Sequence, residues 1–471
     1  MSLARSDIKS AVARHCPGPL GSSARSAEGV ERSDDESSGS SGRSLWRGQR
    51  RAGERTRTSI PVRGPGPKPG ASANSATPAY HGRSLPGPPA TIRSPYGSRR
   101  CGAGAFRRAA TLAAVRVDQV VPSLASRDAI GVHTLAITEA LRGAGVMSDI
   151  FYGDCSPDLV KRARPVGALG RPTKDRWLLY QSSIGSPIFD AFATRSEPKL
   201  VNYHNITPAD LLQSWEPGVG YEVGLGREQL GRIAPQCRLA IADSAFNEGE
   251  LVEAGFGSTA VVPLLIDMTV HADADATRLR TLRAAKADGG PDFLFVGKVS
   301  PHKAPHDLVK MLAVYRRLYH PHARLHLVGS PLGRRYGPAL ESFVAELGLT
   351  EAVTVVGSVA PEELESYYRA ADVFVCASDH EGFCVPIVEA MAHDLPVVAY
   401  AAAAVPETVL DAGLLLESKE PLLFATAVHR VVEDEQLRRQ FSRAAIRRVE
   451  AFSLPRSRQR FVEVVLEAIG V

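Results

Sequence analysis

The chain has 471 residues, of which 44% are hydrophobic and 23% are charged, and its formal net charge is +5. At roughly 150 residues per domain this length allows two to three domains, and the composition excludes collagen, coiled-coil rods and disulfide-stapled miniproteins. No apolar run approaches the roughly 20 residues of a membrane-spanning helix. The six cysteines form no CxxC pair, which argues against structural zinc and for a reducing, cytoplasmic compartment.

The first 110 residues differ from the rest of the chain. They contain 18 Ser, 15 Gly and 11 Pro and carry 19 basic against 7 acidic residues, whereas the remainder holds 37 basic and 44 acidic residues. Such a segment cannot bury enough apolar surface to offset the entropy of ordering, so residues 1–114 are predicted to form a disordered basic tail with weak affinity for polyanions. The alternative is that translation begins at a Val codon such as that of Val115, since no Met lies between Met1 and Met147.

Residues 115–266 alternate apolar runs with amphipathic segments, a pattern typical of a parallel sheet covered by helices on both faces. We interpret them as one Rossmann-like domain. Strands are predicted at 116–121, 148–152, 177–180, 199–203, 239–242 and 259–262, and helices at 132–144, 224–233 and 245–254.

A polar, weakly patterned linker over residues 267–290 precedes a second series of the same kind, predicted to form a second Rossmann-like domain over residues 291–455. The last predicted helix lies within residues 456–471. Strands are predicted at 292–296, 324–328, 353–356, 373–376 and 396–400, and helices at 305–318, 337–347, 361–370, 385–393 and 422–432. Two such domains place the carboxyl ends of both sheets around one cleft, where open α/β sheets bind ligands.

The densest group of chemically capable residues is the segment 378–391, which follows a predicted buried strand and runs into a predicted helix. Gly382 permits close approach of the backbone, and the amides of residues 382–385 would point into the cleft from a helix N-terminus, which favours an anion or a sugar hydroxyl. Carboxylates at Glu381 and Glu389 suit the vicinal hydroxyls of a hexose or ribose. For a generic pair of glutamates an exposed structural position is the commoner interpretation, but this strand-loop-helix setting favours a ligand site.

Glu381 and Glu389, with Gly382, Phe383 and Pro386 between them, resemble the E-x7-E motif of the retaining glycosyltransferases of family 4, which have the GT-B fold. Weaker resemblances to the same family lie at residues 203–207, 295–303, 405–407 and 412–415, so the likeness covers about residues 115–471. It implies an α/β fold in which two Rossmann-like domains face a cleft, preceded here by the disordered tail. It also implies that residues 115–266 bind the acceptor, that residues 291–455 bind the nucleotide sugar, and that the helix within residues 456–471 crosses back to the first domain.

The resemblance also implies a donor site in the second domain. Negative charge grows on the departing nucleoside diphosphate, and without a metal the protein must supply the positive charge. Matching positions assign this role to Lys298 and Lys303; Lys298 replaces the Arg of the family and keeps the charge without the bidentate fork. Two lysines in a loop can also be simply solvated. The donor site implied in full comprises Gly297, Lys298, Lys303, Gly382, Phe383, Cys384 and Glu389, with Glu381 as a catalytic residue.

In the first domain, His204 ends a predicted strand, and the resemblance places such a residue against the transferring sugar as a second catalytic residue. A hydrogen-bonded structural histidine is the alternative. Asp128 and Gly131 belong to the loop after the first strand and are predicted to face the diphosphate or the acceptor across the cleft. Asp273 and Asp275 form a DxD pair, but no strand precedes them, so we expect no metal site.

Together these inferences predict a cytoplasmic, metal-independent enzyme without a cofactor. It would move a hexosyl group, with retention, from a nucleoside-diphosphate sugar to a hydroxyl of a glycan, a lipid or a small molecule. No specific nucleic acid is expected as a partner, and peripheral contact with a membrane stays open. Two alternatives remain, namely a sugar-nucleotide epimerase of the same architecture and a non-catalytic nucleotide-sugar-binding homologue, which the departures at Lys298, Ala403 and Ala404 suggest. The absence of a Gly-rich fingerprint after the first strand argues against an NAD enzyme.

Overall fold

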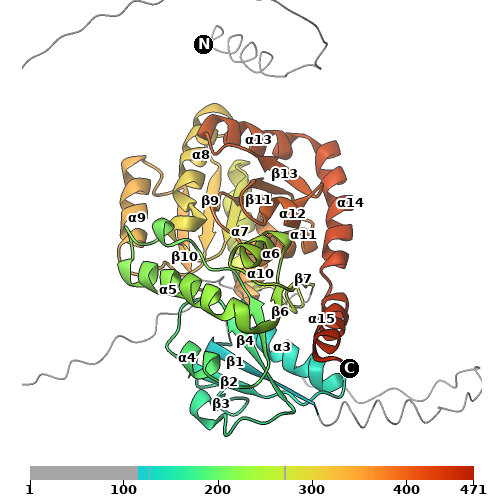
Figure 1. The fold of residues 1–471 in the computed structure, drawn as a ribbon. Coiled ribbons are helices and arrows are strands. Elements are labelled where there is room, and N and C mark those ends of the chain that lie inside the picture. The colour runs from blue at the N-terminus through green and yellow to red at the C-terminus, as the bar shows by residue number, and fades with distance from the viewer. Residues whose placement is uncertain (1–114, 127, 270–271) are drawn as a thin grey trace, which may run out of the picture. The chain divides into compact units, whose positions relative to one another are not determined.

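The computed structural model describes residues 115–126, 128–269 and 272–471 (Figure 1), all of which belong to one compact unit of the chain. The tail predicted over residues 1–114 lies outside the described residues. Two parallel sheets organise the rest, and each has helices on both of its faces. The doubly wound α/β fold predicted from the sequence is therefore confirmed.

The N-terminal sheet has seven strands in the order β3-β2-β1-β4-β5-β6-β7. Its strands are β1 (Arg116–Leu124), β2 (Ile150–Cys155), β3 (Arg164–Pro165), β4 (Arg176–Ser182), β5 (Lys199–Tyr203), β6 (Cys237–Ala242) and β7 (Thr259–Val261). The helices of this half are α3 (Ala129–Gly143), α4 (Ile188–Ala193), α5 (Pro217–Ile233) and α6 (Ala245–Glu253), with short 3-10 turns η1 (Val166–Ala168), η2 (Ala209–Leu211) and η3 (Ala234–Gln236).

The C-terminal sheet repeats this order over six strands, as β10-β9-β8-β11-β12-β13. Its strands are β8 (Asp292–Val296), β9 (Arg324–Val328), β10 (Val353–Gly357), β11 (Val373–Cys376), β12 (Val397–Tyr400) and β13 (Gly413–Leu416). The helices are α7 (Ala276–Ala285), α8 (Pro305–Leu318), α9 (Tyr336–Glu346), α10 (Pro361–Ala370), α11 (Val385–Ala392), α12 (Val405–Val409), α13 (Pro421–Glu433), α14 (Glu435–Ala451) and α15 (Leu454–Ile469), with 3-10 turns η4 (Lys286–Asp288) and η5 (Pro301–Lys303).

Alternate residues of each central strand pack on opposite faces of the sheet, because successive side chains of a strand point in opposite directions. Phe293 and Phe295 of β8 join the core beneath α8 and α13, whereas Leu294 and Val296 join the core beneath α10 and α11. Both faces are thus buried, which explains why these strands read as continuous apolar runs in the sequence.

In each sheet the strand order reverses between two neighbours, β1 and β4 in the N-terminal sheet and β8 and β11 in the C-terminal sheet. The β1–β4 pairing aligns Gln119 with Leu179, and the β8–β11 pairing aligns Phe293 with Val373. Open α/β sheets bind ligands beyond the carboxyl ends of the strands at such switch points. The loops after β1, β8 and β11 are therefore the places to look for a site.

All strands predicted from the sequence are present, and the main differences concern helices. Helix α7 lies within residues 267–290, where a linker was predicted; Asp275 begins it by accepting hydrogen bonds from the backbone amides of Thr277 and Arg278, and α7 packs against α10. Helix α5 begins at Pro217 rather than at residue 224. Helices α4, α12 and α14 and strands β3 and β13 were not anticipated. The domain boundaries themselves stay a prediction.

The last two helices connect the halves of the fold, and Figure 1 shows them following one another along one side of it. Helix α14 packs against α11, and α15 packs against α3. Phe461 and Val465 of α15 are fully buried with Val117 and Ile137 in the core of the N-terminal half. None of the helices within the described ranges is long and apolar enough to span a bilayer.

Candidate functional site

A cleft opens at the carboxyl ends of both sheets, the place where open α/β sheets bind ligands. The first turn of α3 and the residues after β5, β6 and β7 form one wall. The residues after β8 and β11 form the other. The lining residues are Ala129, Ile130, His204, Asp243, Leu264, Val296, Gly297, Lys303, Glu381, Gly382, Phe383, Cys384, Val385 and Pro386.

Seven of the residues predicted from the sequence therefore lie together in this cleft, namely His204, Gly297, Lys303, Glu381, Gly382, Phe383 and Cys384. Four others, Asp128, Gly131, Lys298 and Glu389, do not line it. Sequence reasoning missed Asp243 and Leu264 as lining residues. Asp243 had a usable signal, because it is an acidic residue directly after a buried strand.

The centre of the C-terminal wall is an ion pair between Lys303 and Glu381. The Lys303 Nζ atom lies 2.5 Å from one carboxylate oxygen of Glu381, and the Ser378 hydroxyl donates to the other oxygen at 2.8 Å. Burial opposes the charge on Lys303, but the Glu381 carboxylate raises the pKa of the ammonium above its ordinary value. Both side chains are buried. The pair therefore places a cation and a carboxylate side by side at the carboxyl end of the sheet.

The N-terminus of α11 adds backbone donors beside this pair. Cys384, the residue before the helix, has φ +68° and ψ 66°, a left-handed conformation that is unusual for a residue with a Cβ atom. Val385 and Pro386 then form the first turn and line the cleft. Pro386 has no N–H, and the Ile387 amide donates to the Cys384 carbonyl at 3.1 Å. This helix start therefore offers an anionic group or a hydroxyl oxygen the helix dipole and the Val385 amide.

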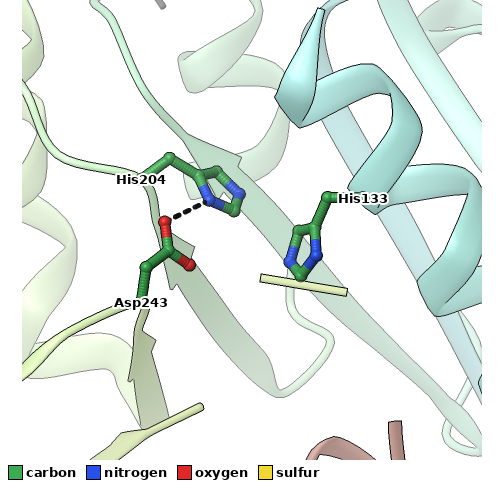
Figure 2. Close-up of side chains that lie close together, drawn as sticks. All are labelled: His133, His204 and Asp243. Carbon is green, nitrogen blue, oxygen red and sulfur yellow. Dashed lines mark hydrogen bonds and ion pairs between the residues drawn. The ribbon is translucent and has the colours of Figure 1, made fainter. Parts of the chain in front are cut away.

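The N-terminal wall is built around His204, the residue after β5. Its Nδ1 atom lies 3.0 Å from Asp243 Oδ2, and its Nε2 atom lies 2.7 Å from Gln181 Oε1 (Figure 2 shows the contact with Asp243). Both ring nitrogens are thus engaged by buried side chains. Gln181 also donates to Gln119 at 2.6 Å, so the histidine belongs to a hydrogen-bond network that runs into the sheet.

His133 of α3 belongs to the same group of side chains. Figure 2 shows its imidazole next to that of His204. The two ring centroids are 5.1 Å apart at nearly a right angle. His133 Nδ1 accepts from the Leu265 amide at 2.7 Å, and Nε2 lies 2.7 Å from the Asn202 amide. Burial and the nearby His204 lower the pKa of His133 well below its ordinary value, so it stays neutral.

Two groups of side chains in the described part of the chain have the spacing of metal ligands. One is His133, His204 and Asp243, and the other is Cys376, Cys384 and Glu381; within each group the ligand atoms lie within 4.8 Å of one another. Each histidine of the first group would have to give up a hydrogen bond to bind an ion. The expectation that the protein uses no metal stays a prediction. Asp275 of the DxD pair caps α7 instead.

Asp128 and Lys298 come from different halves and lie close enough to influence each other's charge. Burial raises the pKa of Asp128 to about 7, although the nearby His204 and Lys298 favour its charged form. Burial also lowers the pKa of Lys298 below its ordinary value, against the effect of Asp128. Both groups thus belong to the electrostatic surroundings of the cleft, and their direct contact with a ligand stays a prediction.

Gly131 and Glu389 have structural partners of their own. A Cβ atom on Gly131 would lie 1.9 Å from the carbonyl oxygen of Ala125, so glycine is needed for the first turn of α3 to pack against the preceding loop. Glu389 is buried in α11 and accepts a hydrogen bond from the Tyr368 hydroxyl of α10 at 2.8 Å. Burial raises its pKa above the ordinary value. Donor contacts by these two residues stay predictions.

Close contacts between the two halves frame the cleft. A Cβ atom on Gly382 would lie 2.5 Å from the Cβ atom of Asn205, so only glycine allows this approach. Glu407 accepts hydrogen bonds from the amides of Ala245 and Phe246 at 2.8 and 2.9 Å, and so caps α6 from the opposite half. These contacts hold the Glu381 loop against the residues that follow β5 and β6.

Comparison with known sequences gives consistent matches. Residues 282–448 match the family described as glycosyl transferases group 1. D-inositol 3-phosphate glycosyltransferases of Geodermatophilus obscurus and Nocardia farcinica are 34% and 31% identical over 50% and 51% of this chain, which covers 52% and 54% of those relatives. The chain thus spans about half the length of these two relatives. The enzyme of the same name from Acidothermus cellulolyticus is 26% identical over 73% of this chain and 74% of its own length.

Solved structures share the fold. Sucrose-phosphate synthase from Thermosynechococcus elongatus has a TM-score of 0.59 at 20% identity and is matched over 76% of this chain and 99% of its own. Anabaena Alr3699/HepE, solved in complex with UDP-glucose, has a TM-score of 0.59 at 19% identity over 75% of this chain and 99% of its own. At these identities the likeness shows the fold alone, and it confirms the expected GT-B architecture.

Proposed function

We propose that the protein is a retaining hexosyltransferase, because residues 282–448 match the family described as glycosyl transferases group 1. It takes a sugar from a nucleoside diphosphate and transfers it to a hydroxyl group of an acceptor. The C-terminal half binds the donor, and the acceptor enters against the N-terminal half.

One observation carries this proposal: the Lys303–Glu381 pair and the start of α11 face His204 across a single cleft. A nucleoside-diphosphate sugar needs positive charge at its phosphates and hydrogen-bond acceptors at its hydroxyls. Lys303 and the start of α11 supply the positive charge, and the Glu381 carboxylate supplies the hydrogen-bond acceptor. The opposite wall then lies where an acceptor has to approach the anomeric carbon.

We infer retention from the resemblance of Glu381 and Glu389 to the E-x7-E motif of the retaining family. Asp243, the carboxylate that lines the N-terminal wall, is buried and lies 3.0 Å from His204 Nδ1. A donor phosphate oxygen is then the base that takes the proton of the acceptor hydroxyl, on the face from which the diphosphate leaves. Lys303 and the helix start stabilise the charge of the leaving diphosphate.

Two names among the similar proteins suggest the first ligands to test. HepE was solved with UDP-glucose, and the curated relatives are named for D-inositol 3-phosphate. We therefore expect a UDP-linked hexose as donor and a phosphorylated polyol or another hydroxyl compound as acceptor.

The test uses the full-length protein in three steps. Thermal shift against a panel of UDP- and GDP-sugars identifies the donor, because a ligand at about 100 times its Kd stabilises the folded state by roughly 2.7 kcal/mol. Transfer to inositol 3-phosphate and other hydroxyl compounds is then followed by NMR, which reports the anomeric configuration of the product. Glu381→Ala should abolish transfer. Inversion of configuration, or release of an epimerised sugar without any acceptor, would contradict the proposal.

A further inference from the structure

Two thiols lie side by side beneath the Glu381 loop. Cys376 is the last residue of β11, and Cys384 is the residue before α11. Both cysteines are free and buried, and their sulfur atoms lie within 4.8 Å of each other and of a Glu381 carboxylate oxygen. The seven residues between them, 377–383, form the loop that carries Glu381 and Gly382. A covalent link between the sulfurs would therefore close a small ring around part of the cleft wall.

The partners of the neighbouring groups favour a thiol pair over a metal site. Both carboxylate oxygens of Glu381 are already engaged, one by Lys303 at 2.5 Å and one by Ser378 at 2.8 Å. A metal ion would have to displace these partners and would face the Lys303 ammonium. Cys376 Sγ contacts the Ser378 hydroxyl at 3.3 Å, and the two thiols also form a hydrogen bond with each other.

The two thiols also differ in acidity, which is the usual property of a reactive pair. The hydrogen bond from Cys384 lowers the pKa of Cys376, and the same bond together with burial raises the pKa of Cys384 well above its ordinary value. Cys376 is thus the more acidic thiol of the two.

Access to the pair comes through the cleft. Cys384 lines the cleft, whereas Cys376 is 1% exposed and lies behind it. A small oxidant such as a peroxide therefore reaches the sulfur of Cys384 first.

We propose that Cys376 and Cys384 form a redox-sensitive dithiol, and that its oxidation to a disulfide weakens ligand binding in the cleft. The first part stands on the thiol pair alone, whereas the second part rests on the proposed donor site.

The oxidant is a hydroperoxide, and the reaction balances in two steps. The Cys384 sulfur attacks the peroxide oxygen, the O–O bond breaks, and Cys384 sulfenic acid and one water (or alcohol) are formed. The Cys376 sulfur then attacks the Cys384 sulfur, the S–S bond forms, and hydroxide leaves and takes up the remaining thiol proton as water. A dithiol reductant reverses the change.

Disulfide formation must disturb the wall because bonded sulfurs lie about 2.05 Å apart. The end of β11 is fixed in the sheet by pairing with β8 and β12. The loop and the first turn of α11 therefore make the adjustment. That loop carries Glu381, whose contact with Lys303 then changes. We expect the Kd of UDP to rise about tenfold on oxidation, since a change of this size needs only a small loss of contact energy.

The experiment treats the full-length protein with hydrogen peroxide and follows two readouts. Mass spectrometry of the tryptic peptide 370–419, which contains both cysteines and no other, should show a mass about 2 Da lower that dithiothreitol restores. Calorimetry with UDP should show the affinity loss and its recovery. Cys376→Ser should abolish the lower mass and accumulate Cys384 oxyacids instead. Cys155→Ser, which changes a thiol on β2, is the matched control and should behave as the wild type.

Each part of the proposal can fail separately. Peroxide that adds oxygen to Cys384 in the wild type without the reversible lower mass would overturn the dithiol. The same holds for stoichiometric zinc that is retained by the purified protein and lost in Cys376→Ser. A reversible disulfide with unchanged UDP affinity would overturn its effect on the cleft. Failure of the reduced protein to bind UDP would count against the proposed donor. The mass measurement would still show whether the two cysteines form a reversible disulfide.

Discussion

The two walls of the cleft follow the same strand order but hold their polar groups in different ways. In the N-terminal half, polar side chains lie within the strands: Gln119 on β1, Gln181 on β4 and Asn202 on β5 are all buried and lead to His204. In the C-terminal half, β8 from Phe293 onward and β11 are apolar, and the polar groups occupy the loops that follow.

This difference suggests different tasks for the two walls. A histidine anchored on both ring nitrogens by a network inside the sheet keeps its orientation before any ligand arrives, as preorganised sites require. Lys303 and Glu381 instead form an ion pair with each other. A donor must compete with that contact, so the C-terminal wall has to rearrange when a ligand binds. The predictions below test this contrast.

Lys303→Ala should have the largest effect. The loss of the cation should lower kcat/KM by about 10²–10³-fold, the size found for single groups that stabilise developing charge. The variant should also be about 3 kcal/mol less stable, because Glu381 is left buried without its partner. Steady-state kinetics and denaturant unfolding measure the two effects.

Two further variants show which part of that loss is structural. Lys303→Met combined with Glu381→Gln removes both charges, and we expect it to recover most of the stability and none of the activity. Lys310→Ala removes a lysine of α8 that pairs with Asp307 and is 43% exposed in its side chain, and should change stability by less than about 1 kcal/mol. Activity in the double variant would refute the role of the pair.

Asp243→Ala should have the second largest effect. Without the Asp243 carboxylate, the His204 ring loses one of its two hydrogen-bond partners. Misplacement of such a group costs on the order of 10²-fold in rate. We expect kcat to fall while the Kd of UDP stays unchanged, because the donor phosphates bind to the other wall. Asp243→Asn retains an acceptor oxygen and should recover part of kcat. An equal loss of nucleotide affinity would show that the two walls are not separate.

The meeting of the two walls was predictable from the sequence. His204 directly follows β5, the Glu381 loop follows β11, and Lys303 lies in the short turn after β8, so the strand order alone brings them to one edge. The position of Glu389 was not predictable in this way. Every residue of α11 through Met391 is buried, so no polar face shows which side of the helix meets the cleft. Its contact with Tyr368 depends on the packing of α10.

The length of α5 was unpredictable for a related reason. The helix contains five glycines, which lower helix propensity by roughly 1 kcal/mol each. A Cβ atom on Gly226 would lie 2.6 Å from the backbone nitrogen of Gly185. The glycine thus serves close packing against the loop after β4, a tertiary contact that local propensity does not reveal.

Two alanine substitutions in α5 test that explanation. Gly226→Ala should lower the free energy of unfolding by roughly 1–3 kcal/mol, the usual cost of overpacking. Gly231→Ala is the matched control, because nothing lies within 4 Å of its added Cβ atom, and it should gain about 0.5 kcal/mol through helix propensity. Denaturant unfolding measures both. Equal effects of the same sign would rule out the packing explanation.

The smallest expected effect concerns pH and links the two walls. Burial raises the pKa of Asp128 to about 7, above the value of about 3.9 in an unfolded chain. The folded protein therefore binds the extra proton between these values, and this contribution to stability is lost as pH rises from about 4 to 7.

The same titration should act on an anionic donor. Above pH 7 the Asp128 carboxylate repels the phosphates, so affinity for UDP-glucose, whose pyrophosphate keeps its charge, should fall about threefold between roughly pH 6 and 8. Asp128→Asn should flatten this profile, whereas Asp411→Asn, at a side chain that is 65% exposed, should leave it unchanged. Calorimetry at several pH values measures the affinity. If the pH dependence of the affinity persists in Asp128→Asn, the titrating group lies elsewhere. The loop that follows β1 would then not act on the donor phosphates.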